Sequence, residues 1–544
     1  RMILDESGGW AMGANLFLPG EKTPVKFNDI HNYPGPNINR EKFDGFLTIG
    51  NSKEENEKRN LFARTPGRNV LPNLPSYVSE IGYGSLPNLE ENEKSFMDKG
   101  NPITYPYLYH IRYNNEIKKA LKKTGLNRIF KDVEDFYKLQ QKVHGVANKR
   151  MIEAIRSNPN VIGYCVHALT AGDWIIGAGL LDLWRNPKGD AYYKTKEANH
   201  EELLVVRTNK RNYYVDEKIE LEFIGINEHK KNQVDLEYFI TNKKNNVIEK
   251  FNFKNLTLKN GVTELNKKSI LKKLDEGEYQ VTAKIKNKNK EIISSNRKFN
   301  VFKRISSSEK IDVALLSEDK KIIKFLKTHN IKYSKFSSST PLEIPILVFN
   351  DKISEVSSSD GNIVATKKNF DKSFENNIEI VTNHVSKGGN VIFLNTPSRI
   401  YRRTGENLTF KIEGKKLLPM DPIKNISQGL WDGILHINKK HPIFKGLPVD
   451  VPLTEIYENI GPTVSFRELE GNNIVQTIAF DRIPNGNIMK RNYIGSGDVW
   501  TASDLSIVDH NNGKMLLSTL KIFENLGKDP VADKILHNMI SFFN

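Results

Sequence analysis

The stretch Ser76-Tyr77-Val78-Ser79-Glu80-Ile81 decides how the first part of the chain is interpreted. It has the length and the apolar and β-branched content of a short strand, and it ends beside a carboxylate that glycines 82 and 84 follow. In a βα barrel, side chains at the carboxyl ends of the strands face the active site. Glu80 is therefore a candidate functional residue. On periodicity alone, however, an ion-paired surface glutamate is the favoured interpretation.

Two similar runs lie on either side of this stretch, at residues 25–31 and 161–167. Helical patterns occupy residues near 105–123 and 133–157, between the second run and the third. Strands that alternate with helices predict βα units and a parallel sheet. His31 and His167 end two of the runs, where they could line one pocket.

The period changes after residue 200. Residues 202–303 hold about seven short alternating strands separated by turn signals, which predicts an immunoglobulin-like β-sandwich. Residues 308–544 return to strands alternating with helices and are interpreted as one open α/β domain. Its end is a helix in which Asp529 caps, Pro530 takes the first position, and Ile535, Leu536, Met539, Ile540 and Phe543 form the apolar face. The predicted domains are 1–200, 201–305 and 308–544.

Composition narrows the classes of protein that remain. The 544 residues are 38% hydrophobic and 27% charged, so the chain can bury a sizeable core and is not wholly disordered. The net charge is +16, and residues 201–310 carry an excess of eight, with 24 Lys and Arg against 16 Asp and Glu. We interpret that excess as solvated strand surface, with contact to an anionic polysaccharide as the alternative; no nucleic acid partner is expected. No apolar run approaches about 18 residues, so no membrane span is expected.

The usual reactive motifs are missing from the sequence. Cys165 is the one cysteine, which excludes a disulfide framework, and its apolar surroundings predict a small buried residue. The glycine pairs 177/179 and 495/497 lack the Lys-Ser/Thr of a phosphate loop, so nucleotide binding is not expected. The 12 histidines form no His-Glu-x-x-His pair. No metal and no cofactor are expected.

The first 200 residues resemble the catalytic barrel of glycoside hydrolase family 2, which includes β-galactosidases, β-glucuronidases and β-mannosidases. The likeness rests on four blocks in order. They resemble strands five to eight of that barrel: Arg1 to Trp10, Asp29-Ile30-His31-Asn32-Tyr33-Pro34, Tyr77-Val78-Ser79-Glu80-Ile81-Gly82-Tyr83-Gly84-Ser85-Leu86-Pro87, and Val161 to Trp174. Asn186-Pro187-Lys188 and Tyr192-Tyr193 resemble the exit from the barrel.

The resemblance implies a retaining β-glycosidase. It makes Glu80 the nucleophile, with Tyr33 orienting it and His31 and Asn32 binding sugar hydroxyls. Further substrate contacts are implied at the eighth strand: His167, Asp173 and Trp174, with the indole either stacking on a sugar or simply packing. His167 stands where many members have Trp, which leaves the sugar open. A β-galactoside is the first choice of substrate, with a β-glucuronide or another polysaccharide-derived β-glycoside next.

The acid/base glutamate of the family follows an Asn at the end of the fourth strand, before the matched blocks. None of the Asn-Glu pairs at 56–57, 92–93, 115–116 and 227–228 ends an apolar strand in the right order. We therefore expect this chain to hold the C-terminal half of the barrel and to be inactive alone, either as part of a longer chain or completed by an N-terminal partner segment. A homo-oligomer is a further expectation.

The last domain resembles the flavodoxin/glutamine-amidotransferase-like α/β domain of some β-galactosidases, at His441-Pro442-Ile443-Phe444-Lys445-Gly446-Leu447-Pro448 and Gly513 to Thr519. Glutaminase chemistry needs a cysteine nucleophile, and residues 308–544 contain none, so this domain is expected to be structural or to drive assembly. The alternative to an enzyme is a non-catalytic carbohydrate-binding or assembly subunit.

Overall fold

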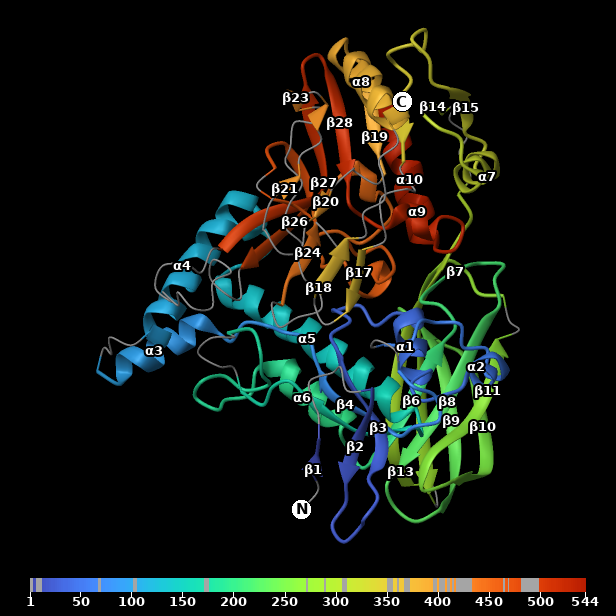
Figure 1. The fold of residues 1–544 in the computed structure, drawn as a ribbon. Helices are drawn as coiled ribbons and strands as arrows, with labels where there is room; N and C mark the ends of the chain where they lie inside the picture. Colours follow the sequence, from blue (N-terminus) through green and yellow to red (C-terminus); the bar gives the residue numbers. More distant parts are fainter. Residues whose placement is uncertain are drawn as a thin grey trace.

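The computed structural model describes residues 3–5, 12–66, 70–100, 105–170, 176–270, 273–287, 290–305, 311–349, 356–359, 362–365, 372–394, 399–400, 407–408, 411–412, 415–416, 433–462, 465–467, 469–480 and 499–544. Figure 1 shows mixed α/β structure with several sheets. A small sheet with helices and a β-rich part lie in its lower half, and a larger sheet lies above them. This confirms the multidomain, β-rich character that the sequence predicts; the barrel, immunoglobulin-like and flavodoxin-like types remain predictions.

The first sheet has five strands in the order β1-β2-β3-β4-β5. They are β1 (Ile3–Leu4), β2 (Met12–Phe17), β3 (Val25–Asn32), β4 (Ser76–Ile81) and β5 (Val161–Val166). β3, β4 and β5 run parallel, as the alternation of strands and helices predicts, and β2 is antiparallel to both of its neighbours. In a barrel the strand at residues 3–4 would lie beside β3. Here β2 lies between them, because the short connection from β2 to β3 permits an antiparallel hairpin but no crossover.

Helices cover one face of this sheet. They are α1 (Arg40–Leu47), α2 (Lys53–Lys58), α3 (Leu89–Asp98), α4 (Tyr105–Thr124), α5 (Val133–Arg156) and α6 (Gly189–Ala198), with a 3-10 turn η1 (Leu126–Arg128). Ile30, Val78 and Ile81 are completely buried in the core that these helices form. The expectation that Cys165 is buried is wrong: its side chain is exposed, because β5 is the edge strand of the sheet.

The β-rich part consists of two sheets. The strands are β6 (Glu202–Thr208), β7 (Asn212–Tyr214), β8 (Ile219–Asn227), β9 (Asn232–Asn242), β10 (Val247–Leu258), β11 (Gly261–Ile270), β12 (Gly277–Asn287) and β13 (Lys290–Phe302). One sheet has the order β10-β9-β12-β13-β7 and the other β11-β8-β6. The two sheets enclose a shared apolar core in which the rings of Phe223 and Tyr238 stack with centroids 4.8 Å apart. Leu203 and Val205 point the other way, into the helical core of the first part, so β6 is buried on both faces.

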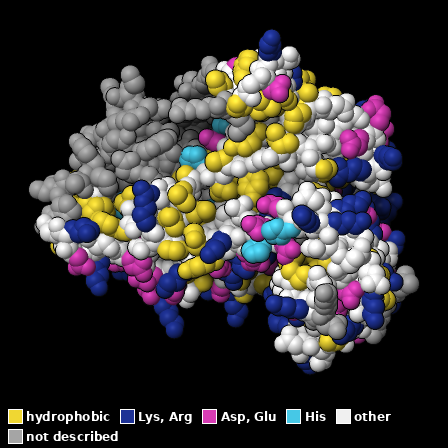
Figure 2. All heavy atoms as spheres, turned by 90° about the horizontal axis from the view of Figure 1, so that it is seen from below, with side chains coloured by type: hydrophobic (Ala, Val, Ile, Leu, Met, Phe, Trp, Pro, Cys, Tyr) yellow, Lys and Arg dark blue, Asp and Glu magenta, His cyan; other side chains and the backbone are white. Residues whose placement is uncertain are grey.

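Many basic side chains of residues 201–310 form ion pairs with acidic side chains on the strand surfaces. Glu237, for example, pairs with Lys250 at 2.6 Å and with Lys286 from the other neighbouring strand. On the face in Figure 2, Lys and Arg side chains are interspersed with Asp and Glu and form no single basic patch. On this face, the pattern favours solvated surface over a docking site for an anionic polymer.

The last part is built on a nine-stranded sheet. Its strands are β14 (Asp312–Leu315), β15 (Lys332–Lys335), β16 (Ile346–Val348), β19 (Asn390–Phe393), β24 (Leu435–Asn438), β25 (Phe466–Arg467), β26 (Asn472–Phe480), β27 (Val499–His510) and β28 (Gly513–Ser518). β15, β14, β16, β19 and β28 are parallel in that order, and β27, β26 and β24 continue the sheet antiparallel. Short pairs lie outside it: β17 (Val356–Ser359) with β18 (Asn362–Ala365), β20 (Arg399–Ile400) with β21 (Asn407–Leu408), and β22 (Lys411–Ile412) with β23 (Lys415–Lys416).

The helices of this part are α7 (Lys320–Thr328), α8 (Lys372–Ser386), α9 (Ile522–Asn525) and α10 (Pro530–Phe543), with 3-10 turns η2 (Pro442–Phe444) and η3 (Glu455–Tyr457). The start of α10 follows the sequence-based prediction: Asp529 is the cap, accepts a hydrogen bond from the Val531 amide at 2.9 Å, and precedes Pro530. Ile535, Leu536, Met539 and Ile540 are completely buried.

Asp529 also joins the last part to the β-rich part. Its carboxylate accepts hydrogen bonds from Asn212 of β7, at 3.0 and 3.2 Å, and from Asn459, at 2.9 Å. Burial raises the pKa of Asp529 to about 6, although these hydrogen bonds pull it the other way. The pKa of Asp529 in the folded state therefore lies above the usual 3.8. Protonation of this carboxyl group thus stabilises the folded state relative to the unfolded state.

We expect the stability that Asp529 contributes to be fully present below about pH 3.8 and to be lost as the pH rises through about 6. The loss is on the order of 3 kcal/mol for a shift of about two pKa units. Asp529→Asn cannot titrate, so the wild type should lose stability relative to this variant between pH 4 and pH 7. Urea unfolding midpoints at four pH values measure the difference. Asp319→Asn, which removes the titratable charge from the more exposed cap residue of α7, is the control. Parallel pH curves for wild type and Asp529→Asn would contradict the assignment.

Candidate active site

Three parallel strands bring the predicted site residues to one edge of the first sheet. His31 and Asn32 are the last residues of β3, and Tyr33 follows them. Glu80 lies at the end of β4, directly opposite His31 in the strand register. His167 follows β5, whose last residue Val166 lies opposite Ile81. Because the carboxyl ends of parallel strands meet at one edge, the structure places side chains from all three sequence blocks there.

Glu80 is the centre of this group. The Tyr33 hydroxyl donates a short hydrogen bond to Glu80 Oε2, and His31 Nδ1 lies 3.3 Å from the same oxygen. The Glu80 side chain is 32% exposed, whereas that of His31 is 18% exposed. The partners recorded for Glu80 in the described residues are thus a tyrosine and a histidine of the neighbouring strand, not the lysine or arginine of a solvated ion pair. The carboxylate is both fixed and reachable.

A β-bulge in β4 sets the direction of the Glu80 side chain. Asp29 pairs with Tyr77, and His31 pairs with Glu80, so β4 uses three residues where β3 uses two. The burial of β4 alternates up to Ser79 and then breaks, with Glu80 partly exposed as well. Strict alternation would put Glu80 on the helix-covered face with Val78, whereas the bulge turns it to the face of Tyr77. The sequence carried no signal for this irregularity.

Ser79 and Asp29 form a second polar contact beside Glu80. Ser79 Oγ donates a short hydrogen bond to Asp29 Oδ1, and Asp29 is completely buried. This contact ties β4 to β3 one step below the Tyr33–Glu80 bond.

The loop after β4 is held from several directions. An added Cβ at Gly82, which has φ +150°, would lie 2.9 Å from the carbonyl oxygen of His167, so the loops after β4 and β5 touch at this glycine. The Tyr83 hydroxyl donates to the carbonyl of Ile434, at 2.7 Å, in the last part of the chain. The Ser85 amide donates to the Gly177 carbonyl at 3.0 Å. These contacts fix the backbone directly after the candidate nucleophile.

Lys188 holds the same loop through side-chain hydrogen bonds. It is buried, and its ammonium donates to the carbonyls of Ser85 at 2.5 Å, Ala178 at 3.2 Å and Gly177 at 3.4 Å. Burial lowers the pKa of Lys188 to about 7, while Asp182 opposes the shift. Sequence reasoning placed Lys188 in the barrel exit and missed this role, since its partners lie up to about 100 residues away.

Of the four other predicted site residues, the structure describes two. Asn32 is half-buried at the end of β3, and His167 is half-buried after β5. Asp173 and Trp174 lie outside the described residues.

Within the described ranges, no three His, Cys, Asp or Glu side chains are grouped so as to hold a metal ion. No described helix is long and apolar enough to cross a membrane.

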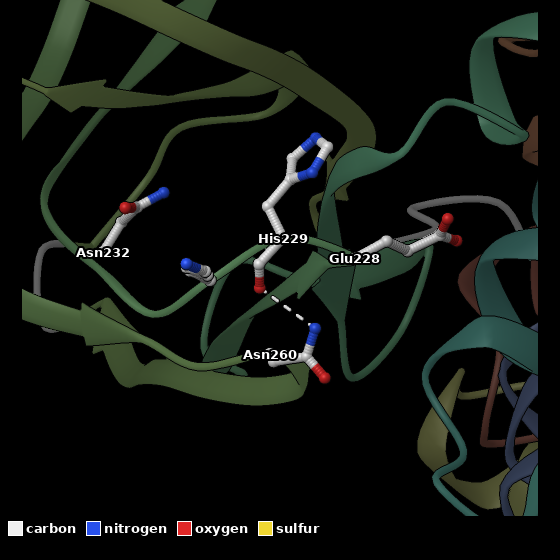
Figure 3. Close-up of a pocket in the computed structure, with 5 residues that line it drawn as sticks. Glu228, His229, Asn232 and Asn260 are labelled. Atoms are coloured by element: carbon white, nitrogen blue, oxygen red, sulfur yellow. Dashed lines mark hydrogen bonds between the residues drawn. The ribbon is translucent and has the colours of Figure 1, made fainter.

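A separate pocket lies on the β-rich part, lined by Glu228, His229, Lys230, Asn232 and Asn260. Figure 3 shows Asn260 reaching the backbone carbonyl of His229, a hydrogen bond of 3.0 Å, while the Glu228 side chain extends away from the pocket. Glu228 pairs with Arg156, at the end of α5, at 2.7 Å. The pocket is a wide surface hollow between the β8–β9 turn and the β10–β11 turn, and it includes none of the Glu80 group.

Comparisons with known proteins give a weak likeness at the level of fold. No family model matches the sequence, and no curated protein matches it. Solved structures with a partial likeness include a β-D-mannosidase from Dictyoglomus thermophilum, with 17% identity and a TM-score of 0.31, covering 50% of this chain and 30% of that one. A β-glucuronidase of glycoside hydrolase family 2 has 18% identity and a TM-score of 0.14, covering 18% and 11%.

An exo-chitosanase from Amycolatopsis orientalis has 12% identity and a TM-score of 0.21, covering 29% of this chain and 19% of that one. The chain thus spans less than a third of the length of each of these three glycoside hydrolases.

Proposed function

We propose that the protein is a retaining β-glycosidase of the β-galactosidase-like kind, with Glu80 as its nucleophile. The observation that carries the proposal is the fixed but reachable carboxylate at the end of β4, bonded by Tyr33 and facing His31. A retaining glycosidase needs a carboxylate held in its ionised form next to the anomeric carbon. The hydrogen bond from the Tyr33 hydroxyl holds Glu80 Oε2 in one orientation.

The proposed chemistry has two steps. A Glu80 carboxylate oxygen attacks the anomeric carbon, the bond to the leaving oxygen breaks, and a general acid protonates that oxygen. Water, deprotonated by the same group, then attacks the anomeric carbon and releases Glu80. Tyr33 and His31 hold Glu80 Oε2, which directs the carboxylate at the sugar. Asn32 and His167, together with Asp173 and Trp174, are proposed to bind sugar hydroxyls and the sugar face.

The general acid is not assigned to an Asn-Glu pair of this chain. Glu57, Glu93 and Glu116 lie in the helices α2, α3 and α4, and Glu228 follows β8 of the β-rich part. None of the four glutamates lies on the five-stranded sheet. We propose that further barrel strands bring the acid, packing beside β5. The side chains of Ile162 and Cys165 on that edge strand are exposed, which supports this arrangement.

The last part of the chain is proposed to be a non-catalytic domain of the glutamine-amidotransferase-like type. Its parallel strands follow the order second, first, third, fourth and last, which is the order of one common doubly wound fold. Its sequence contains no cysteine that could act as a glutaminase nucleophile. Tyr83 and Gln140 donate hydrogen bonds into it, at Ile434 and Gly433, next to the loop that follows Glu80. A supporting role fits these contacts.

A covalent label tests the nucleophile separately from the acid. We expect a 2-deoxy-2-fluoro-β-glycosyl fluoride to label Glu80, because fluoride leaves without a proton from the general acid, and the 2-fluoro group slows hydrolysis of the glycosyl-enzyme. Peptide mass spectrometry locates the label, and galactosyl, glucosyl and mannosyl reagents compare the sugars. Glu264→Gln, at an exposed position of β11, is the control and should label normally. Stable sugar binding without a label on Glu80 would favour the non-catalytic binding subunit.

A further inference from the structure

A cavity of about 300 Å³ lies where the three parts of the chain meet. The first part contributes residues of α5 and of the segment after β3, the β-rich part contributes Arg211 and Arg297, and the last part contributes residues 448–458. Much of the wall is apolar: Ile38, Leu139, Val143, Val146, Val451 and Ile456. The cavity is separate from the Glu80 group and shares no residue with it.

Three arginines line this cavity and are almost completely buried. The side chains of Arg211, Arg297 and Arg150 are 6%, 10% and 13% exposed. The Nε–H group of each is buried and makes no hydrogen bond within the described part of the protein. Buried polar groups are normally satisfied, so three such donors around one cavity call for an acceptor.

The nearby carboxylates do not accept hydrogen bonds from these three Nε–H groups. Arg297 Nη2 and Arg211 Nε both lie 3.5 Å from the same oxygen, Glu458 Oε2, which is too far for strong hydrogen bonds. Arg150 uses Nη1 for a short bond to Glu153. Arg211 Nη2 also lies 3.8 Å from Glu455 Oε2. The wall therefore has two closely placed guanidinium groups with only long contacts to Glu458 and Glu455, and a third guanidinium beside them.

The charge of the wall is positive. Lys142, Arg150, Arg211 and Arg297 face the cavity together with Glu455 and Glu458, so basic side chains outnumber acidic ones by two. Burial, followed by repulsion from Arg211 and Arg150, lowers the pKa of Arg297 to about 9. An anion in the cavity would relieve this repulsion. Arginine suits such a site because its planar guanidinium pairs with carboxylate or phosphate through two parallel bonds.

We propose that this junction cavity binds a small organic anion, with its carboxylate or phosphate on the three arginines and its apolar body against the wall from α5 and residues 448–458. The volume and lining are those of a small-molecule site, with a mainly apolar wall and a few convergent polar groups. Because all three parts supply residues, the bound anion stabilises their junction. The proposal is independent of the glycosidase activity.

Isothermal titration calorimetry on the whole chain tests the site. Benzoate and benzamide share shape but differ in charge, and phenyl phosphate separates a phosphate from a carboxylate preference. We expect at least one of the two anions to bind with one-to-one stoichiometry and at least about tenfold more tightly than benzamide. Equal binding of benzamide and both anions, or no binding of either anion, would overturn the proposal.

Two variants place the binding in the cavity. Arg297→Gln removes one charge, and Val146→Phe fills the space while it keeps every charge; each should weaken anion binding at least about tenfold. Their matched controls are Arg304→Gln, at a half-exposed arginine after β13, and Val247→Phe, at an exposed position of β10. Circular dichroism shows which variants fold. Unchanged binding in folded Val146→Phe would show that the anion lies elsewhere.

Discussion

Replacement of Glu80 by glutamine is expected to lower the turnover of an aryl β-glycoside at least about 10⁴-fold, the scale on which loss of a nucleophile acts. Glutamine keeps the size of the side chain and can still accept the hydrogen bond from Tyr33, so the fold should change little. It cannot form the glycosyl-enzyme, because an amide is a poor nucleophile. The measurement is kcat/KM for a nitrophenyl glycoside with the protein in its complete natural form.

A second variant separates lost chemistry from lost structure. Glu80→Ala opens space beside His31 and Tyr33, and added azide can attack the anomeric carbon from the face that the carboxylate occupied. The product should then be the α-glycosyl azide, which nuclear magnetic resonance distinguishes from the β-sugar. Glu80→Gln with near-normal turnover would remove Glu80 from the mechanism. Failure of azide rescue in a folded Glu80→Ala protein would argue against its position beside the anomeric carbon.

The largest expected loss of stability comes from Arg207→Met. Arg207, on β6, is 6% exposed; it makes a short hydrogen bond to Asp44 of α1 and pairs with Glu222 of β8 at 2.7 Å. Methionine fills a similar volume but leaves two carboxylates with fewer partners in a buried interface. Removal of one partner of a buried ion pair costs about 3–5 kcal/mol. We expect a value near the lower end, because Arg40 still contacts Asp44 at 2.6 Å and Glu222 at 3.6 Å.

The pKa of Glu222 explains why this loss depends on charge. Burial alone would raise it, but Arg207 and Arg40 outweigh burial and hold it below its usual value. Combining Arg207→Met with Glu222→Gln should therefore recover part of the loss, because the surplus carboxylate is removed and Asp44 stays paired with Arg40. Arg304→Met, at a half-exposed arginine, should cost about 1 kcal/mol or less. Urea unfolding followed by circular dichroism compares the four proteins; equal midpoints for Arg207→Met and Arg304→Met would refute the expectation.

Local patterns in the sequence predicted the parts of the fold that depend on neighbours along the chain. The apolar runs at 25–31, 76–81 and 161–167 correspond to β3, β4 and β5, and their parallel arrangement follows from the helices between them. The start of α10 at Asp529 and Pro530 was also predicted, because a cap uses the amides of the next few residues. The β-rich character of 202–303 followed from its period of two.

The contacts around Glu80 were predicted only in part. The group of His31, Tyr33 and Glu80 was expected from the resemblance and from the rule that parallel strands end at one edge. Three features were not expected: the bulge in β4, the hydrogen bonds from Lys188 to the following loop, and the hairpin formed by β2 and β3. Cys165 was expected to be buried but is exposed. Each of these depends on strand register or on partners far along the chain, which periodicity does not report.

The sequence by itself therefore determined the kinds of segment, the order of the three parts and the residue types available for chemistry. The tertiary structure decided which side chains meet: the direction of Glu80, the buried pairs of Arg207, and the three arginines at the junction cavity. The physical reason is the distance along the chain over which each interaction acts. Hydrophobic period and capping act over a few residues, whereas a charge pair or a cavity wall forms between residues that only the packing of helices and sheets brings together.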